Sequence, residues 1–177
     1  MKKALSILCI FILFIIIYLI QSNFFSWFTI AGVQPNLFII LAIFVGLYMG
    51  HIYGLTIGAV LGILLDLHIG RVIGINGIAL GVAGLLAGII NKNVSKDSKM
   101  TIMLTVAGIT FVSTLIIYLM QIAVLGVQVE ILAFLRIILI ETLYNVILSI
   151  IIYPLFQRGG NLIERIFTEK KILTRHF

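Results

Sequence analysis

The sequence predicts an all-α integral membrane protein with about six transmembrane helices and both termini in the cytoplasm. Three observations predict this fold class: continuous apolar runs, the placement of the basic residues, and small residues that recur every four positions. The 177-residue chain is 62% hydrophobic and 10% charged, with a mean hydropathy of +1.28. A water-soluble chain of this length cannot bury so much apolar surface. A membrane β-barrel would show alternating rather than continuous apolar residues.

Six apolar segments define the expected helices. A full span needs about 20 residues. The second and third segments are shorter, so they either thin the membrane or end inside protein. A five-span alternative would merge or submerge one of them. The segments cover residues 4–20, 36–49, 52–67, 73–90, 101–125 and 131–156.

The basic residues predict the orientation of these segments. Cytoplasmic loops of membrane proteins carry an excess of Lys and Arg. With the N-terminus inside, ten of the twelve basic residues are cytoplasmic, and only Arg71 and Arg136 are not. The ten lie in the first three residues, in the loop 91–100 and in the tail: Lys2, Lys3, Lys92, Lys96, Lys99, Arg158, Arg165, Lys170, Lys171 and Arg175. The sequence therefore predicts a multi-pass membrane protein with both ends inside.

Two segments outside the spans have distinct compositions: one is aromatic and the other is basic. Residues 21–35 carry no charge but are rich in aromatic residues, including Trp27. They are expected to form either an aromatic belt at the headgroup level or a docking surface for a partner's transmembrane helix. Residues 1–157 form the predicted membrane domain. Residues 158–177, which begin near Gly159-Gly160, are expected to form a basic amphipathic tail on the cytoplasmic face of the membrane.

Small residues spaced four apart predict close helix packing. Lipid does not drive helices together as water does, so membrane helices associate through small residues that let their backbones approach. The stripe is interpreted either as internal packing of the second to fourth spans or as a face left open for a partner helix. The residues assigned to this interface are Gly46, Gly50, Gly54, Gly58, Gly62, Gly77 and Gly81.

Three charged residues fall within or near the predicted spans. Charge inside a membrane is costly and requires a partner. Asp66 follows the glycine ladder near the outer end of the third span, at a depth that allows pairing with Arg136 or Arg71. Glu141 lies deeper, and Asn145 follows it by one turn on the same face. Asp66, Arg136 and Glu141 are therefore expected to form a buried polar clasp that fixes helix register. The alternative is a proton or substrate site made of the same residues.

No motif for catalysis or cofactor binding is recognisable in the sequence. It contains no Walker A loop, no dinucleotide-binding fingerprint and no zinc-type His pair. The basic residues do not form one patch that would fit nucleic acid. We therefore expect no enzyme activity, no cofactor, no metal and no nucleic acid partner.

One stretch of the chain resembles a known family. Pro35-Asn36-Leu37 opens the second span and Val45-Gly46-Leu47-Tyr48-Met49-Gly50 closes it. Gly54, Gly58 and Gly62-Ile63-Leu64-Leu65-Asp66 follow, and then Gly70, Gly74 and Gly77. This pattern resembles the bacterial MreD family of rod shape-determining proteins. The resemblance covers essentially the whole chain, and its specific part is residues 35–88.

The resemblance implies a non-enzymatic scaffold of the cell-elongation complex that supports lateral peptidoglycan synthesis and rod shape. The implied direct partner is MreC. The indirect partners are MreB, the SEDS-type polymerase RodA and a class B penicillin-binding protein. The implied fold is similar to the substrate-binding components of energy-coupling factor vitamin transporters. That similarity keeps open an alternative function as a small-molecule uptake subunit, in which Asp66, Arg136 and Glu141 line a pocket.

Overall fold

The computed structural model describes residues 2–25, 27–69, 72–91 and 98–168, with side chains described for 6–160 of these. The described chain is helical apart from its connections, which confirms the predicted all-α class. The helices begin with α1 (Lys2–Leu19) and the short π-helix η1 (Ile20–Phe24). The others are α2 (Leu37–Met49), α3 (His51–Ile69), α4 (Ile75–Ile90), α5 (Lys99–Leu125) and α6 (Ile131–Thr168).

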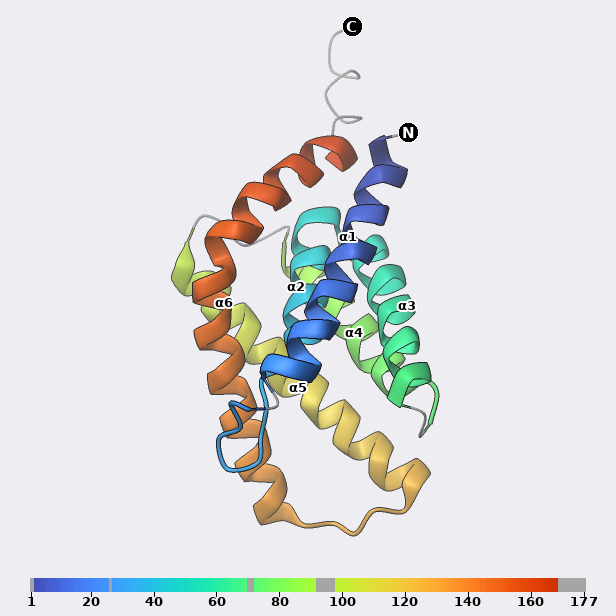
Figure 1. Ribbon diagram of the computed structural model, residues 1–177, viewed down its shortest axis with the longest axis vertical. Helices are drawn as coiled ribbons and strands as arrows, with labels where there is room; N and C mark the ends of the chain where they lie inside the picture. The colour runs from blue at the N-terminus through green and yellow to red at the C-terminus, as the bar shows by residue number, and fades with distance from the viewer. Residues whose placement is uncertain (1, 26, 70–71, 92–97, 169–177) are drawn as a thin grey trace, which may run out of the picture.

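The two ends of the helical bundle differ. α1 begins and α6 ends at the same end of the molecule, and the α5–α6 connection lies at the opposite end (Figure 1). We call that opposite end the distal end. α6 continues as one helix past residue 158 to Thr168, so the expected membrane domain and tail are not separated by a break in the helix. The remainder of the expected tail, residues 169–177, lies outside the described residues.

Helix lengths divide the bundle into long and short members. Four helical stretches are long and apolar enough to cross a membrane: Ser6–Phe24, His51–Ile69, Lys99–Leu125 and Ile131–Gly160. α2 and α4 have 13 and 16 residues. The second segment is therefore short, as expected, whereas the third is longer than expected because α3 extends from His51 to Ile69. The fourth segment is the other short one, because α4 has only 16 residues.

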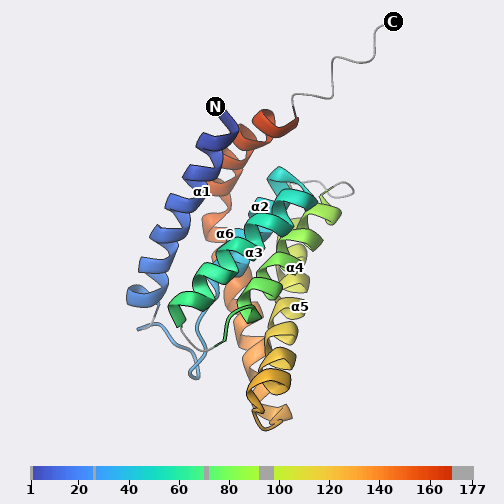
Figure 2. The ribbon, with the colours of Figure 1, turned by 90° about the vertical axis from the view of Figure 1, so that its right-hand side faces the viewer.

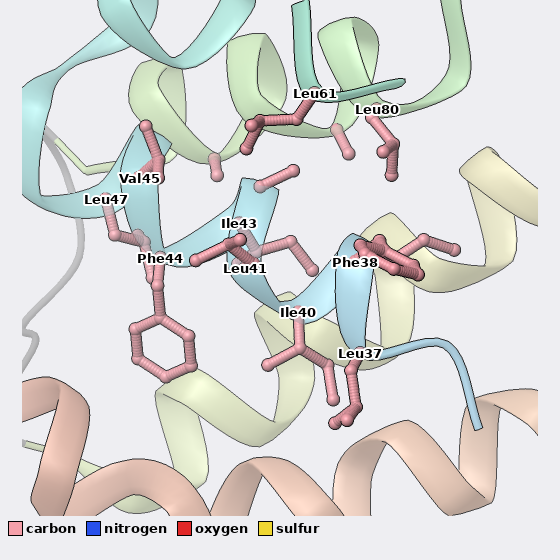
Figure 3. Packing of buried hydrophobic residues seen from close by; sticks show 14 of the residues in the cluster. Leu37, Phe38, Ile40, Leu41, Ile43, Phe44, Val45, Leu47, Leu61 and Leu80 are labelled. Atoms are coloured by element: carbon pink, nitrogen blue, oxygen red, sulfur yellow. The ribbon is translucent and has the colours of Figure 1, made fainter. Parts of the chain in front are cut away.

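α2 forms the centre of the molecule. All 13 of its residues are buried, so it is apolar on every side. It contacts α1, α3, α4, α5 and α6, and Figure 3 shows its side chains directed to several sides, with Leu61 and Leu80 facing it. The ring of Phe44 stacks on that of Phe156 in α6, with centroids 4.0 Å apart. A helix of about 20 Å cannot span a hydrocarbon core of about 30 Å, but protein rather than lipid surrounds α2.

Glycines bring α4 into backbone contact with both α2 and α3. A Cβ placed on Gly46, Gly58 or Gly62 would lie 2.2–2.4 Å from a backbone carbonyl oxygen of α4. Gly54 meets Gly84 in the same way, at 2.3 Å from its carbonyl oxygen. No side chain fits in these positions, because real Cβ atoms do not approach other atoms so closely. These four glycines therefore pack inside the protein against the backbone of α4.

The remaining predicted glycines differ in what they contact. A Cβ on Gly77 would lie 2.9 Å from the Ile63 side chain, and one on Gly81 would lie 3.3 Å from Ala59 Cβ. Gly50 makes no such contact. It connects α2 to α3 with a φ of +91°, a conformation that side chains disfavour. It therefore serves the turn, and its backbone also packs on α4, since its carbonyl carbon lies 2.6 Å from where a Cβ on Gly88 would stand.

Gly58→Ala is expected to lower the free energy of unfolding by about 1–3 kcal/mol, the usual cost of overpacking. The added methyl group would lie 2.4 Å from the Leu80 carbonyl oxygen, so α3 and α4 must separate. Thermal unfolding in detergent measures the effect. Gly108→Ala on α5 is the matched control, since no atom lies within 4 Å of that Cβ position. Equal unfolding temperatures for the two variants would contradict the tight α3–α4 contact.

Candidate functional site

Asp66 caps the start of α4. Its carboxylate, only 2% exposed, accepts hydrogen bonds from the backbone N–H groups of Gly74 (2.8 Å), Asn76 (3.2 Å) and Gly77 (3.1 Å). The Asn76 side-chain amide adds a fourth bond of 2.7 Å. The first N–H groups of a helix have no partner within the helix and carry its positive dipole end, so a carboxylate there is stabilised without a basic residue. This explains how a charged group is accommodated between α3 and α4.

Glu141 lies in a second polar cluster, between α5 and α6. Its Oε2 atom accepts a hydrogen bond of 3.1 Å from the Thr114 hydroxyl, and the Asn36 side chain also hydrogen-bonds to it. One turn along α6, Asn145 is fully buried and donates to the Thr110 hydroxyl at 3.3 Å. We call Asn36, Thr110, Thr114, Glu141 and Asn145 the α5–α6 polar cluster.

The α5–α6 polar cluster also holds the start of α2. The backbone N–H of Asn36 donates to Asn145 Oδ1 at 2.8 Å, and the Asn36 side chain accepts from Ile39 N at 3.3 Å, which makes it the N-cap of α2. On the other side, the Gln21 side-chain amide donates to the Pro35 carbonyl oxygen and accepts from Leu37 N. A helix that begins inside the protein therefore has its first donors satisfied by side chains of η1 and α6.

Arg136 is exposed on the first two turns of α6. The structure therefore does not bring Asp66, Arg136 and Glu141 together into one clasp. Asp66 binds the start of α4 and Glu141 binds α5 and Asn36. The prediction was wrong because it assumed that each carboxylate pairs with a basic side chain. Backbone N–H groups, hydroxyls and an amide bind these carboxylates instead. Arg71, the other expected partner of Asp66, lies outside the described residues.

The sequence interpretation missed most of the α5–α6 polar cluster. The signal was present as a polar stripe on each of two apolar helices. Thr110, Ser113 and Thr114 recur at helical spacing on α5, and Glu141, Asn145 and Ser149 do so on α6. Gln21 and Asn36 carry no comparable periodicity, because they come from connecting segments.

Two buried hydroxyls near this region have no hydrogen-bond partner among the described residues, those of Ser113 and Thr142. An unpartnered buried hydroxyl costs free energy without a compensating bond. The cluster residues therefore differ from Ser113 and Thr142: the side chains of the cluster are hydrogen-bonded, whereas these two hydroxyls are not.

Asp66→Ala is expected to lower the free energy of unfolding by about 1–3 kcal/mol and to destabilise the start of α4, because three backbone N–H groups lose their acceptor. Hydrogen–deuterium exchange of residues 74–77 measures the local effect, which should be an acceleration. Asp66→Asn retains one acceptor oxygen and should give a smaller change. Thr56→Ala on the same helix is the control, because that hydroxyl bonds only to carbonyl oxygens of α3. Unchanged exchange in Asp66→Ala would show that this cap does not hold α4.

Asn145→Leu is expected to lower the free energy of unfolding by about 1–3 kcal/mol, because Asn36 N–H and the Thr110 hydroxyl lose a buried partner. Thr142→Val is the matched control three residues away, and it should be neutral or stabilising since its hydroxyl bonds to nothing described. Denaturant unfolding in detergent compares the two. A Thr142→Val variant as unstable as Asn145→Leu would contradict the importance of the α5–α6 polar cluster.

Comparison with known proteins assigns the chain to a family. The family model for rod shape-determining protein MreD matches residues 1–158 of the 177. No curated protein and no solved structure matches the chain. The matched region contains the glycine-packed helices, the Asp66 cap and the α5–α6 polar cluster. The chain therefore belongs to the MreD family of rod shape-determining proteins.

Proposed function

We propose that this protein is a non-enzymatic scaffold of the cell-elongation complex that binds MreC and supports lateral peptidoglycan synthesis. Membership of the MreD family supports a role in rod shape determination. In this proposal MreB, RodA and a class B penicillin-binding protein are indirect partners. The protein is a multi-pass protein of the cytoplasmic membrane, with both termini inside.

One observation carries the proposal: the packing glycines, Asp66 and the α5–α6 polar cluster all make contacts inside the protein. The glycines face α4, Asp66 caps α4, and the α5–α6 polar cluster holds the start of α2. The surface left for other molecules is apolar and helical, with large exposed side chains along α1, α5 and α6. A rigid interior with an apolar exterior suits a protein that acts by presenting helix faces to lipid and to partner helices.

The same observation disfavours the uptake alternative. A small-molecule site needs polar groups that converge on a cavity. The three residues assigned to that pocket do not converge, because Asp66 and Glu141 have separate internal partners and Arg136 is exposed.

Affinity purification from crosslinked native membranes tests the proposed function. We expect the tagged protein to recover MreC and the wall polymerases, and a strain that lacks the protein to lose rod shape. Gly62→Leu should reduce both recovery and shape complementation, because a Cβ there would already lie 2.3 Å from the Asn76 carbonyl oxygen. Gly108→Leu is the control at an open position.

The two variants must be compared at equal membrane levels, so that a difference reports assembly rather than degradation. Recovery of a paired ATPase with a coupling membrane subunit, in place of MreC, would overturn the proposal. Unchanged recovery and cell shape in Gly62→Leu would contradict the dependence of assembly on the glycine contacts.

A further inference from the structure

The chain between η1 and α2 forms a short hairpin beside α6. It follows the end of α1 that points toward the distal end (Figures 1 and 2). Ile30 and Val33 exchange two backbone hydrogen bonds, of 3.1 and 2.9 Å, and the two residues between them have positive φ values of 55° and 80°. The Tyr144 hydroxyl of α6 donates a hydrogen bond of 3.0 Å to the Phe28 carbonyl oxygen. The hairpin is therefore ordered and is held at a defined height on α6.

Large aromatic side chains cover the outside of this hairpin. Phe24 is 56% exposed, Phe28 53% and Trp27 87%. The rings of Phe24 and Phe28 pack with centroids 4.8 Å apart, and the backbone N–H of Trp27 donates to the Phe24 carbonyl oxygen at 3.2 Å. No residue from 21 to 35 is charged. We call Phe24, Trp27 and Phe28 the aromatic tip.

The length of the preceding span gives the depth of the aromatic tip. The apolar stretch Ser6–Phe24 has 19 residues and extends about 28 Å, close to the hydrocarbon thickness of about 30 Å. When this stretch spans the membrane, Phe24 lies near the boundary between the hydrocarbon and the headgroups. Trp27 and Phe28 follow three and four residues later, so they lie in or beside the same layer.

Two opposite requirements restrict the hairpin to this layer. Non-helical backbone cannot be exposed to lipid tails, because its unpaired N–H and C=O groups need water. Exposed aromatic rings, in contrast, are unfavourable in bulk water. The headgroup layer meets both requirements, since it supplies polar partners to the backbone and apolar contact to the rings. Tryptophan is enriched in this layer for the same reason.

We propose that the aromatic tip is an anchor that inserts into the phospholipid headgroup layer and fixes the depth of the neighbouring helices. The Tyr144 hydroxyl connects the hairpin to α6. The Gln21 side chain connects it to the start of α2, because it bonds to both the Pro35 carbonyl oxygen and Leu37 N. The ligand in this proposal is lipid, so the proposal does not depend on the scaffold function.

Tryptophan fluorescence tests the proposal directly, because Trp27 is the only tryptophan in the chain. The full-length protein is reconstituted into phosphatidylcholine vesicles that contain lipid brominated either close to the headgroup or near the end of the acyl chain. Bromine quenches a tryptophan that it contacts. We expect the shallow bromine to quench Trp27 more strongly than the deep bromine. Water-soluble acrylamide should quench Trp27 less than it quenches free tryptophan.

Two variants complete the test. Trp27→Phe combined with Leu143→Trp is the matched control, because Leu143 is 63% exposed near the middle of the apolar stretch Ile131–Gly160. The deep bromine should quench that tryptophan more strongly than the shallow one. Tyr144→Phe removes the bond to the Phe28 carbonyl oxygen and should increase acrylamide quenching of Trp27, because the hairpin loses its attachment to α6.

Several results would overturn the proposal. These are stronger quenching of Trp27 by the deep bromine, acrylamide quenching equal to that of free tryptophan, or no quenching by either bromine or acrylamide. Unchanged quenching in Tyr144→Phe would contradict the connection to α6. In native membranes, a photoreactive phenylalanine analogue at position 27 should give phospholipid adducts, and a specific protein adduct there would show that a protein covers the tip instead. Recovery of MreC is measured separately, so either proposal can fail alone.

Discussion

The backbone contact of α4 with α2 and α3 is the constraint on which the rest of the structure depends. Gly46 and Gly54 both approach Gly84, so α4 holds two neighbouring helices at the same point. Lipid supplies no hydrophobic force to pull these helices together, and close packing over small residues supplies the attraction instead. Because α4 lies so close and the other helices cover the remaining sides, α2 is enclosed on all sides and does not need the length of a spanning helix.

Enclosing α2 and starting α4 within the bundle creates a second requirement. Each helix start leaves N–H donors that neither lipid nor water satisfies there. Asp66 provides the acceptors for α4, and Gln21, Asn36 and Asn145 provide the bonds at the start of α2. The costly polar groups of the spans are thus explained by the short helices that they complete. Their positions follow from where α2 and α4 begin.

The sequence predicts the helical class and the family because both depend on local composition and short spacing. It also indicates that the glycines pack, since a four-residue repeat places them on one helix face. It does not reveal that Gly50 forms a turn, because the repeat continues unbroken through the end of α2. The partners of Asp66 could not be foreseen either, since backbone N–H groups are present at every residue and only the fold selects which ones a carboxylate meets. Opposite charges in the sequence suggested a clasp that the fold does not form.

The glycines and the buried polar side chains are engaged in contacts inside the protein, whereas the exposed surface is apolar. This difference limits the ways in which such a small membrane protein could act. In the proposed scaffold function, the backbone contacts hold α2, α3 and α4 in a fixed arrangement relative to one another, so the protein would act by offering surfaces rather than by a change of shape. Most of its exposed apolar faces need no partner, because lipid covers them.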